Sequence, residues 1–438
     1  MNFTELVAPN GLFCDGDWIE KKDQDIHGNV RLIQLADIGV GIFKDKSSKY
    51  LTECKAQELN CTYLQKGDIL IARLPEPLGR ACIFPLDGKY ITAVDIAIVR
   101  IDRHDISPKY VMYMVNSPGF RSAIKEHESG TTRKRISRKN LDKIQFDIPP
   151  LPEQERIVAR IEELFSQLDA GVNELKTAKE RLKVYRQAVL KAAFEGRYTH
   201  EWRHTHPQQS PKSDFNSIKL PHPVFKDTSG DENEIPLFKP KSWKKVRFGE
   251  IFEVEVGATP SRRVVEYWNG DIPWVSSGEI HFDAISNTRE CITQDGLNHA
   301  STNVQPIGTV MLAMIGEGKT RGQVALLNIE AAHNQNTAAI LVSKTPCVPK
   351  YIYYFLVLNY ENTRCVGSGN NQKALNKERV RALRFPFASF AEQALIVQEI
   401  ESRLSVCDSI EKTVGSALQQ AEALRQSILK KAFEWGLI

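Results

Sequence analysis

The sequence predicts an α+β protein built from two similar halves, each an α+β globular domain that ends in a long helix. Three observations support this prediction: similarity between the halves, apolar stripes of helical period at the end of each half, and short β-like runs before them. A length of 438 residues alone suggests about three domains. The internal similarity reduces these to one unit used twice, with a linker between the copies.

The globular domains are expected at residues 1–150 and 243–388. Short apolar runs bounded by Gly, Pro, Asn and Asp fit strands in both, and a helical run follows the strands in each half. The expected strands are Ile69–Ala72, Ile96–Ile101, Val310–Ile315 and Ala338–Val342, and the expected helices lie near Tyr110–Glu126 and Tyr351–Arg364.

The two long helices are expected at residues 151–196 and 389–438. An offset of 239 positions lays Glu153-Gln154 on Glu392-Gln393, and apolar residues recur at steps of three and four in both segments. A helix of about 44 residues would be about 65 Å long, and its stripe must be buried. The matched lengths favour an antiparallel two-helix coiled coil with pseudo-two-fold symmetry that acts as a spacer. The alternative is two separate amphipathic helices, each packed on its own globular domain.

Composition excludes several classes of protein and identifies the segment between the halves. Residues 197–242 contain six prolines among Ser, Lys, Asp and Glu, which indicates a linker. Without a run of about 18 apolar residues or a secretory leader, we expect a cytoplasmic protein that does not enter membranes. The eight cysteines form no C-x-x-C pair, which favours buried reduced thiols over disulfides or a zinc ribbon. A net charge of +4 indicates a nucleic-acid binder only if basic residues cluster locally.

Such a cluster lies in residues 129–140, after the helix near Tyr110. Lys and Arg at this density suit phosphate binding, because each neutralised phosphate releases counterions. Residues 368–376 keep the same frame in the second half but carry Asn, Gln and Lys, as expected for a domain that recognises a different DNA sequence. A solvated charged turn is the alternative. The candidate DNA-binding residues are Thr131, Thr132, Arg133, Lys134, Arg135, Arg138 and Lys139 in the first half, and Asn370, Asn371, Gln372 and Lys373 in the second.

A second pair of candidate loops lies between two strands of each half. Arg73 and Arg80 belong to the first loop, and Lys319 and Arg321 belong to the second. Their matching positions indicate a shared role in DNA binding. An ordinary hairpin tip is the alternative.

Two segments match sequence motifs that are found in enzymes. Residues 313–320 fit a relaxed P-loop with Lys319 and Thr320, but a strand is expected after them, where a phosphate cradle needs a helix. His200, Glu201 and His204 match the zinc motif H-E-x-x-H, but they lie past the end of the first long helix among polar residues. An ATP-dependent or zinc-dependent enzyme therefore stays as the alternative function, and no catalytic residues are expected.

Several motifs have a familiar arrangement. They are Pro149–Val158 at the start of the first long helix, Arg186–Lys191 and Ala193–Gly196 at its end, Thr199-x-x-Trp202-Arg203 after it, and a second copy from Glu392 to Phe433. With these motifs, essentially the whole chain resembles the specificity (S) subunits of Type I restriction-modification systems.

The resemblance implies two target-recognition domains, each of which reads half of a bipartite site on double-stranded DNA, with the helices as spacers. It implies two modification subunits that bind S-adenosylmethionine and methylate adenine. It also implies restriction subunits that use ATP and Mg. The S subunit itself would have no catalytic site, cofactor or metal. The residues expected to dock the subunits or form the spacer are Glu153, Gln154, Arg186, Gln187, Phe194, Glu392, Gln393, Arg425, Gln426 and Phe433.

Overall fold

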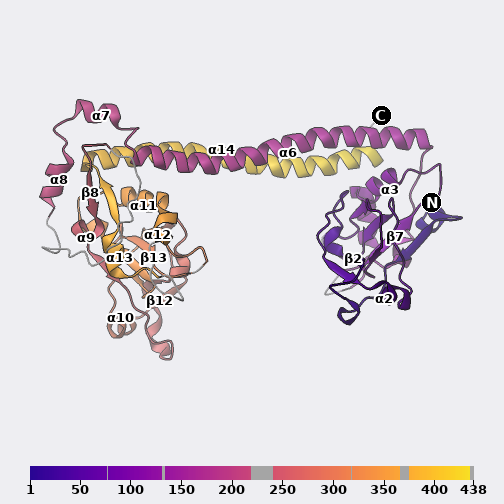
Figure 1. The fold of residues 1–438 in the computed structure, drawn as a ribbon, viewed down its shortest axis with the longest axis horizontal. Helices are drawn as coiled ribbons and strands as arrows, with labels where there is room; N and C mark the ends of the chain where they lie inside the picture. Colours follow the sequence, from indigo (N-terminus) through magenta and orange to yellow (C-terminus); the bar gives the residue numbers. More distant parts are fainter. Residues whose placement is uncertain (76, 131–133, 219–239, 317, 366–373, 435–438) are drawn as a thin grey trace. The chain divides into compact units, whose positions relative to one another are not determined.

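Two units make up the fold, and each contains β-sheets together with parts of both long helices (Figure 1). The first unit comprises residues 1–178 and 414–438, and the second comprises residues 179–413. The structure, a computed structural model, describes the chain except residues 76, 131–133, 219–239, 317, 366–373 and 435–438.

The main sheet of the first unit is antiparallel, with the strand order β1-β7-β4-β5. Both of its faces are buried: Ile69 and Ile71 of β4 pack into one core cluster, and Leu70 and Ala72 pack into another. This alternation follows from the two-residue period of a strand, and it explains why the run is apolar throughout. The strands are β1 (Leu12–Asp15), β4 (Ile69–Ala72), β5 (Ala81–Ile83) and β7 (Ile96–Arg100).

A smaller sheet and short helices complete the first unit. The smaller sheet has the order β3-β2-β6, and β2 and β6 are parallel. Its strands are β2 (Val30–Ile33), β3 (Lys49–Leu51) and β6 (Tyr90–Thr92), and the helices of the unit are α1 (Phe3–Val7), η1 (Lys21–Asp23), η2 (Leu35–Asp37), α2 (Glu53–Glu58), α3 (Pro108–Val115), α4 (Pro118–Glu126) and α5 (Arg138–Leu141).

The single helix expected near Tyr110–Glu126 is two helices, α3 and α4. Pro118 begins α4, and the Ser117 hydroxyl accepts a hydrogen bond from the Phe120 amide at 3.3 Å. Proline disfavours a helical conformation in the residue before it and has no N–H to donate, so the chain cannot continue as one helix. The helix expected near Tyr351–Arg364 is also divided, into α11 (Pro349–Leu358) and α12 (Tyr360–Cys365).

The second unit has a main sheet of order β11-β14-β13-β16-β9, whose β9-β16-β13-β14 part matches β1-β7-β4-β5 in order and direction. A three-stranded sheet β12-β10-β15 and a pair β17-β8 complete it. Its strands are β8 (Lys244–Arg247), β9 (Val254–Val256), β10 (Trp268–Val275), β11 (Ala284–Ile285), β12 (Glu290–Ile292), β13 (Val310–Ala313), β14 (Val324–Leu327), β15 (Ala332–His333), β16 (Thr337–Ile340) and β17 (Arg384–Phe387). Besides α11 and α12, its short helices include α9 (Phe248–Ile251), η3 (Val265–Tyr267), η4 (Ser277–Glu279), α10 (Gln294–Ala300), η5 (Val342–Lys344) and α13 (Lys377–Ala382).

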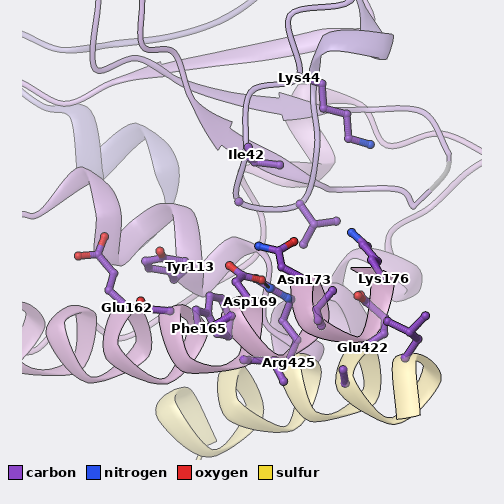
Figure 2. A pocket seen from close by; sticks show the side chains of 18 residues that line it. Ile42, Lys44, Tyr113, Glu162, Phe165, Asp169, Asn173, Lys176, Glu422 and Arg425 are labelled. Atoms are coloured by element: carbon purple, nitrogen blue, oxygen red, sulfur yellow. Dashed lines mark hydrogen bonds and ion pairs between the residues drawn. The ribbon is translucent and has the colours of Figure 1, made fainter. Parts of the chain in front are cut away.

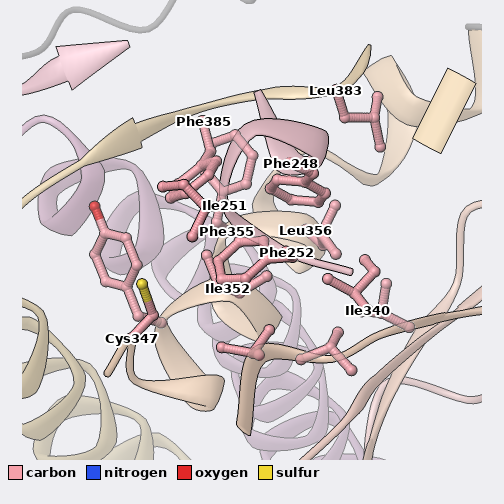
Figure 3. Packing of buried hydrophobic residues seen from close by; sticks show 14 of the residues in the cluster. Phe248, Ile251, Phe252, Ile340, Cys347, Ile352, Phe355, Leu356, Leu383 and Phe385 are labelled. Carbon is pink, nitrogen blue, oxygen red and sulfur yellow. The ribbon is translucent and has the colours of Figure 1, made fainter. Parts of the chain in front are cut away.

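Several aromatic rings pack together in the core of the second unit (Figure 3). Phe252 stacks on Phe385 with ring centroids 5.6 Å apart, and Phe248 meets Phe385 edge-on at 5.1 Å. Aromatic pairs of this kind contribute about 1 kcal/mol each beyond the burial of their area. The same core includes Ile396 and Ile400 at the start of a long helix, so the helix is fixed to the domain.

The long helices are α6 (Leu151–Phe194) and α14 (Phe390–Glu434), of 44 and 45 residues, and they lie within the two segments where long helices were expected. In the first unit, the start of α6 and the end of α14 pack into the same core, which contains Ile161 and Leu429. In the second unit, the start of α14 and the end of α6 do so, with Ile400 and Phe194. Neither helix therefore packs on one globular domain alone.

The first part of the expected linker packs against the second unit. Residues 197–218 include α7 (His200–Thr205) and α8 (Pro211–Ser217), and Ile218 joins the core. The Asp214 carboxylate accepts a hydrogen bond from the Phe390 amide at 2.8 Å, so α8 caps the start of α14. Residues 219–239 of the expected linker lie outside the described residues.

The cysteines are less buried than expected. Cys82, Cys347 and Cys407 are buried, whereas Cys54 is exposed and Cys14, Cys61 and Cys291 are half-buried. Among the described residues, no helix is long and apolar enough to cross a membrane.

Candidate nucleic-acid interface

The two candidate loops of the first unit lie against each other. The Ile136 amide donates a hydrogen bond to the Arg73 carbonyl at 3.1 Å. Asp15, at the end of β1, pairs with both loops: its carboxylate oxygens lie 2.8 Å from Arg73 Nη1 and 3.7 Å from Arg138 Nε. The structure thus brings together Arg73 and Arg138, two basic residues that were predicted separately.

Exposure separates the roles of these arginines. The Arg73 side chain is only 14% exposed and donates to the Val94 carbonyl at 2.7 Å, whereas the Arg138 side chain is 48% exposed. Lys134, Arg135 and Lys139 are exposed. Among the described candidates of this unit, Arg138 and these three residues are therefore the basic side chains exposed enough to reach a phosphate, while Arg73 mainly supports the loop. The candidates Thr131, Thr132 and Arg133 lie outside the described residues.

Arg80 is not a DNA-contacting residue, contrary to the prediction. The residue is only 7% exposed, and its guanidinium donates to the carbonyls of Ile38 at 2.8 Å and Leu35 at 2.9 Å. Its Nη1 also donates to the carbonyls of Leu74 and Pro77. A guanidinium enclosed by carbonyl groups fixes the backbone around it and cannot reach a ligand.

The second unit joins its candidate loops in the same way. The Leu375 amide donates to the Met314 carbonyl at 3.0 Å, as Ile136 does to Arg73 in the first unit. Lys319 is exposed, whereas Arg321 is only 8% exposed, so burial removes Arg321 from the candidates as it does Arg80. Asn370, Asn371, Gln372 and Lys373 lie outside the described residues.

A groove of about 1230 Å³ in the first unit does not suit DNA (Figure 2). It lies between the 40–44 loop and the helices α6 and α14. Glu162, Asp169 and Glu422 line it together with Lys44, Lys176 and Arg425. Acidic and basic groups in equal number would not attract a polyanion, so the basic loops are the better candidate surface.

The family model for the Type I restriction modification DNA specificity domain matches residues 31–180 and 240–420. The chain belongs to this family. It contains two such α+β domains, one in each matched range.

Individual relatives support the assignment. The specificity subunit of the Type I restriction enzyme EcoBI from Escherichia coli is 28% identical over 339 residues, which cover 73% of this chain and 64% of that subunit. The EcoKI specificity subunit from Escherichia coli strain K12 is 25% identical over 334 residues, which cover 75% of this chain and 65% of that one. The chain thus spans less than two thirds of the length of these relatives.

Two solved structures share the fold. One is a chain from a study entitled "Structural basis underlying complex assembly and conformational transition of the type I R-M system", with a TM-score of 0.69 and 17% identity over 100% of this chain and 97% of that chain. The other is the crystal structure of the HsdS subunit from Thermoanaerobacter tengcongensis, with a TM-score of 0.53 and 16% identity over 98% of each chain.

In this member of the specificity-domain family, Gln154 and Gln393, which were predicted to dock subunits or form the spacer, lie in the long helices and are fully buried. Gln154 Oε1 accepts from the Ser107 amide at 2.8 Å, and Gln393 Oε1 accepts from the Val348 amide at 3.0 Å. Each Nε2 donates to a carbonyl just before its own helix, at 2.8 Å and 2.9 Å respectively. The two glutamines fix the start of each long helix to the loop that precedes α3 or α11.

Phe194 and Glu392, from the same predicted set, also lie in the long helices and are buried. The Phe194 ring packs on Tyr351 with centroids 5.0 Å apart. The Glu392 carboxylate accepts from Trp243 Nε1 at 2.8 Å and from Arg203 Nη1 at 2.5 Å. Both residues hold the second unit together.

The remaining predicted helix residues are more exposed. Arg186 pairs with Asp408 on the other helix at 2.6 Å, and Arg425 pairs with Asp169. Phe433 is half-buried and packs on Tyr110 at 5.2 Å. Glu153 and Gln187 are exposed and Gln426 is half-buried, so these three stay available to a partner.

The structure describes most of the two segments that resembled enzyme motifs. Strand β14 follows the Lys319 turn, as the sequence predicted, so no helix N-terminus meets the position of a phosphate. His200 and His204 are exposed on α7 with their Nε2 atoms 3.4 Å apart. Within the described part of the chain, no three His, Cys, Asp or Glu residues are grouped so that they could hold a metal ion.

Proposed function

We propose that this chain is the DNA-recognition subunit of a Type I restriction-modification complex, in which each unit reads one half of a bipartite site. One observation carries the proposal. Both units join the same two loops through an equivalent backbone hydrogen bond, from Ile136 to Arg73 and from Leu375 to Met314. The framework is kept while the exposed side chains differ, as two readers of different sequences require.

The long helices act as an antiparallel coiled-coil spacer in this proposal, and the two halves arose as a tandem repeat with pseudo-two-fold symmetry. Reciprocal ion pairs support it: Arg186 of α6 pairs with Asp408 of α14, and Arg425 of α14 pairs with Asp169 of α6. The two arginines are 239 positions apart in the sequence, and so are the two aspartates. The domains proposed are residues 1–150 and 243–388, with spacer helices at 151–196 and 389–438 and a connection at 197–242.

The proposed partners are double-stranded DNA, two modification subunits that bind S-adenosylmethionine, and restriction subunits that use ATP and Mg. The curated relatives are specificity subunits of Type I restriction enzymes, which supports this assembly. Glu153, Gln187 and Gln426 are the proposed contacts for the modification subunits. We place the assembled complex in the cytoplasm.

Catalysis is assigned to the partner subunits and not to this chain. The competing function is an enzyme that uses Lys319 and Thr320 with ATP, or His200, Glu201 and His204 with zinc. The strand after the Lys319 turn and the exposed, two-histidine arrangement on α7 argue against it. The purified chain is expected to bind neither ATP nor stoichiometric zinc, which equilibrium dialysis and metal analysis would check.

Mapping adenine methylation in cells that express this chain with its partner subunits tests the proposed function. A bipartite methylated sequence is expected. Substitution of residues 370–373 by the matching loop of another specificity subunit should change one half-site and leave the other intact. If both halves changed together, the division between the units would be wrong.

A further inference from the structure

Tyr360, at the start of α12, contacts two separate surface segments of the second unit. Its hydroxyl donates a hydrogen bond to the carbonyl of Lys319 in the 318–322 turn. Its ring meets the ring of Phe282 edge-on, with centroids 5.0 Å apart. Residues 281–289, which include Phe282 and the two-residue strand β11 (Ala284–Ile285), are called the 281–289 loop below. One tyrosine therefore fixes this loop beside the turn that carries the exposed Lys319.

Arg364 of the same helix strengthens the connection to the turn. Its Nη2 donates to the Gly318 carbonyl at 2.5 Å, and its Nη1 lies 3.2 Å from the Tyr360 hydroxyl. The side chain also packs against Gly322, where a Cβ would lie 2.9 Å from Arg364 Cγ. Because Gly322 has a φ of +84°, the turn needs glycine at this point for both conformation and space.

Phe282 is held in an unusual backbone conformation. Its φ is +61°, in the left-handed region that costs a bulky residue about 1–2 kcal/mol. The Phe282 amide donates to the Val324 carbonyl at 2.9 Å, and Tyr353 donates to the Phe282 carbonyl. Conformations of this kind persist where the surroundings impose them, and they are concentrated at ligand-binding sites.

The residues on either side of Phe282 lie at the surface. His281 and Asp283 flank Phe282, and both are exposed. They line a surface hollow of about 370 Å³ together with Asn287 and Arg289. Glu279 also lines the hollow, but its carboxylate accepts hydrogen bonds from the Ser276 and Arg289 amides at 2.8 Å and so folds the loop.

We infer that the 281–289 loop is a further DNA-reading element of the second unit, with His281 and Asp283 as base contacts and Tyr360 as the residue that positions it. The inference rests on the proposed function and extends it to residues outside the basic and amide-rich loops. The inference does not depend on the candidate residues Asn370–Lys373.

The chemistry of the loop favours base edges over phosphates. A carboxylate repels the phosphate backbone, but it can accept a hydrogen bond from the amino group of cytosine in the major groove. Histidine can donate to the ring nitrogen or carbonyl oxygen of a purine. The adjacent Lys319 supplies the positive charge that a nearby phosphate requires.

Methylation mapping with this chain and its partner subunits tests the inference through four variants. His281→Ala and Asp283→Ala should each relax one position of the half-site read by the second unit, with about tenfold less discrimination there. Tyr360→Leu, which removes the ring from Phe282, should relax the same positions. Tyr360→Phe keeps the ring and should relax them less.

Tyr267→Phe is the matched control, because Tyr267 lies in the same unit and stacks on His299 through its ring. It should leave both half-sites unchanged. A merely structural role of Tyr360 would lower methylation at all sites in proportion to the loss of folded protein, without relaxing any position. That result, or unchanged specificity in His281→Ala and Asp283→Ala, would overturn the inference. A wild-type complex that methylates no bipartite site would instead overturn the proposed function, and the inference with it.

Discussion

Arg203 and Glu392 form a buried ion pair in which Nη1 and Oε1 are 2.5 Å apart and the side chains are 15% and 1% exposed. Glu392 lies in the first turn of α14, whereas Arg203 lies in α7, after the end of α6. The hydroxyl of Thr199 donates to the same carboxylate at 2.7 Å. The segment after one long helix is therefore fixed to the start of the other.

Glu392→Gln is expected to destabilise the second unit by about 3 kcal/mol, because removing one charge leaves the guanidinium of Arg203 buried without its counter-charge. Thermal denaturation followed by circular dichroism would measure the change. The matched control is Glu153→Gln, which alters the residue at the equivalent position of α6. Since Glu153 is exposed, this variant should shift the midpoint little. Equal shifts in the two variants would contradict the role assigned to the buried pair.

Arg425→Ala is expected to weaken the packing of α14 on α6 in the first unit by about 1 kcal/mol. Arg425 pairs with Asp169, and its guanidinium lies over the Phe165 ring, 4.4 Å from the centroid. A partly exposed ion pair contributes little, and the contact with the ring adds to it. A double-mutant cycle with Asp169→Ala would isolate the ion pair, for which a coupling of about 0.5 kcal/mol is expected. Strictly additive effects would show that the ring contact alone matters.

Acid should destabilise the second unit through His333. Burial lowers the pKa of His333 to about 4 from an ordinary value of 6.5, although Glu255 partly opposes the shift. Between these values the unfolded chain binds a proton that the folded chain does not, so the free energy of unfolding decreases as the pH decreases from 6.5 to 4. The loss is on the order of 3 kcal/mol across that window.

Thermal midpoints measured from pH 7 to pH 4 would check this dependence on pH. His333→Gln should flatten the curve, whereas His27→Gln, which removes an exposed histidine of the first unit, should leave its slope unchanged. A His333→Gln variant with the wild-type slope would show that other groups cause the acid sensitivity.

Local sequence patterns predicted the regular elements well and the burial of polar residues poorly. Strand β4 has the bounds expected from its apolar run, because four consecutive buried residues leave a clear signal. The role of Arg80 could not be predicted, since its acceptors include the carbonyl of Ile38, which is distant in the sequence. Arginine in a loop looks the same in sequence whether it faces solvent or carbonyl groups.

Two further differences between the predicted and the observed structure left signals in the sequence. Ser117-Pro118 is a capping pattern that marks the break between α3 and α4, so this break could have been predicted. In the expected linker, Phe215 and Ile218 are apolar residues among polar ones, and they pack on the second unit. The average composition of the segment is polar, so it did not reveal these two apolar residues. The role of Asp15, which pairs with Arg73 and Arg138, depends on contacts between distant strands and loops and left no local pattern.

Arg138→Gln is expected to weaken DNA binding by the assembled complex and to reduce the dependence of binding on salt. Each phosphate contact contributes about one unit to the slope of log K against log salt concentration, so the slope should decrease in magnitude by about one. Fluorescence anisotropy with duplex DNA at salt concentrations from about 50 to about 200 mM would measure this slope. Arg80→Gln is the matched control from the same unit. It leaves buried carbonyl groups without their donors, so it should lower the thermal midpoint. The protein that stays folded should bind DNA with the wild-type salt dependence. The opposite result, a reduced slope in Arg80→Gln and an unchanged slope in Arg138→Gln, would contradict both assignments. Arg80 would then contact DNA, and Arg138 would support the fold.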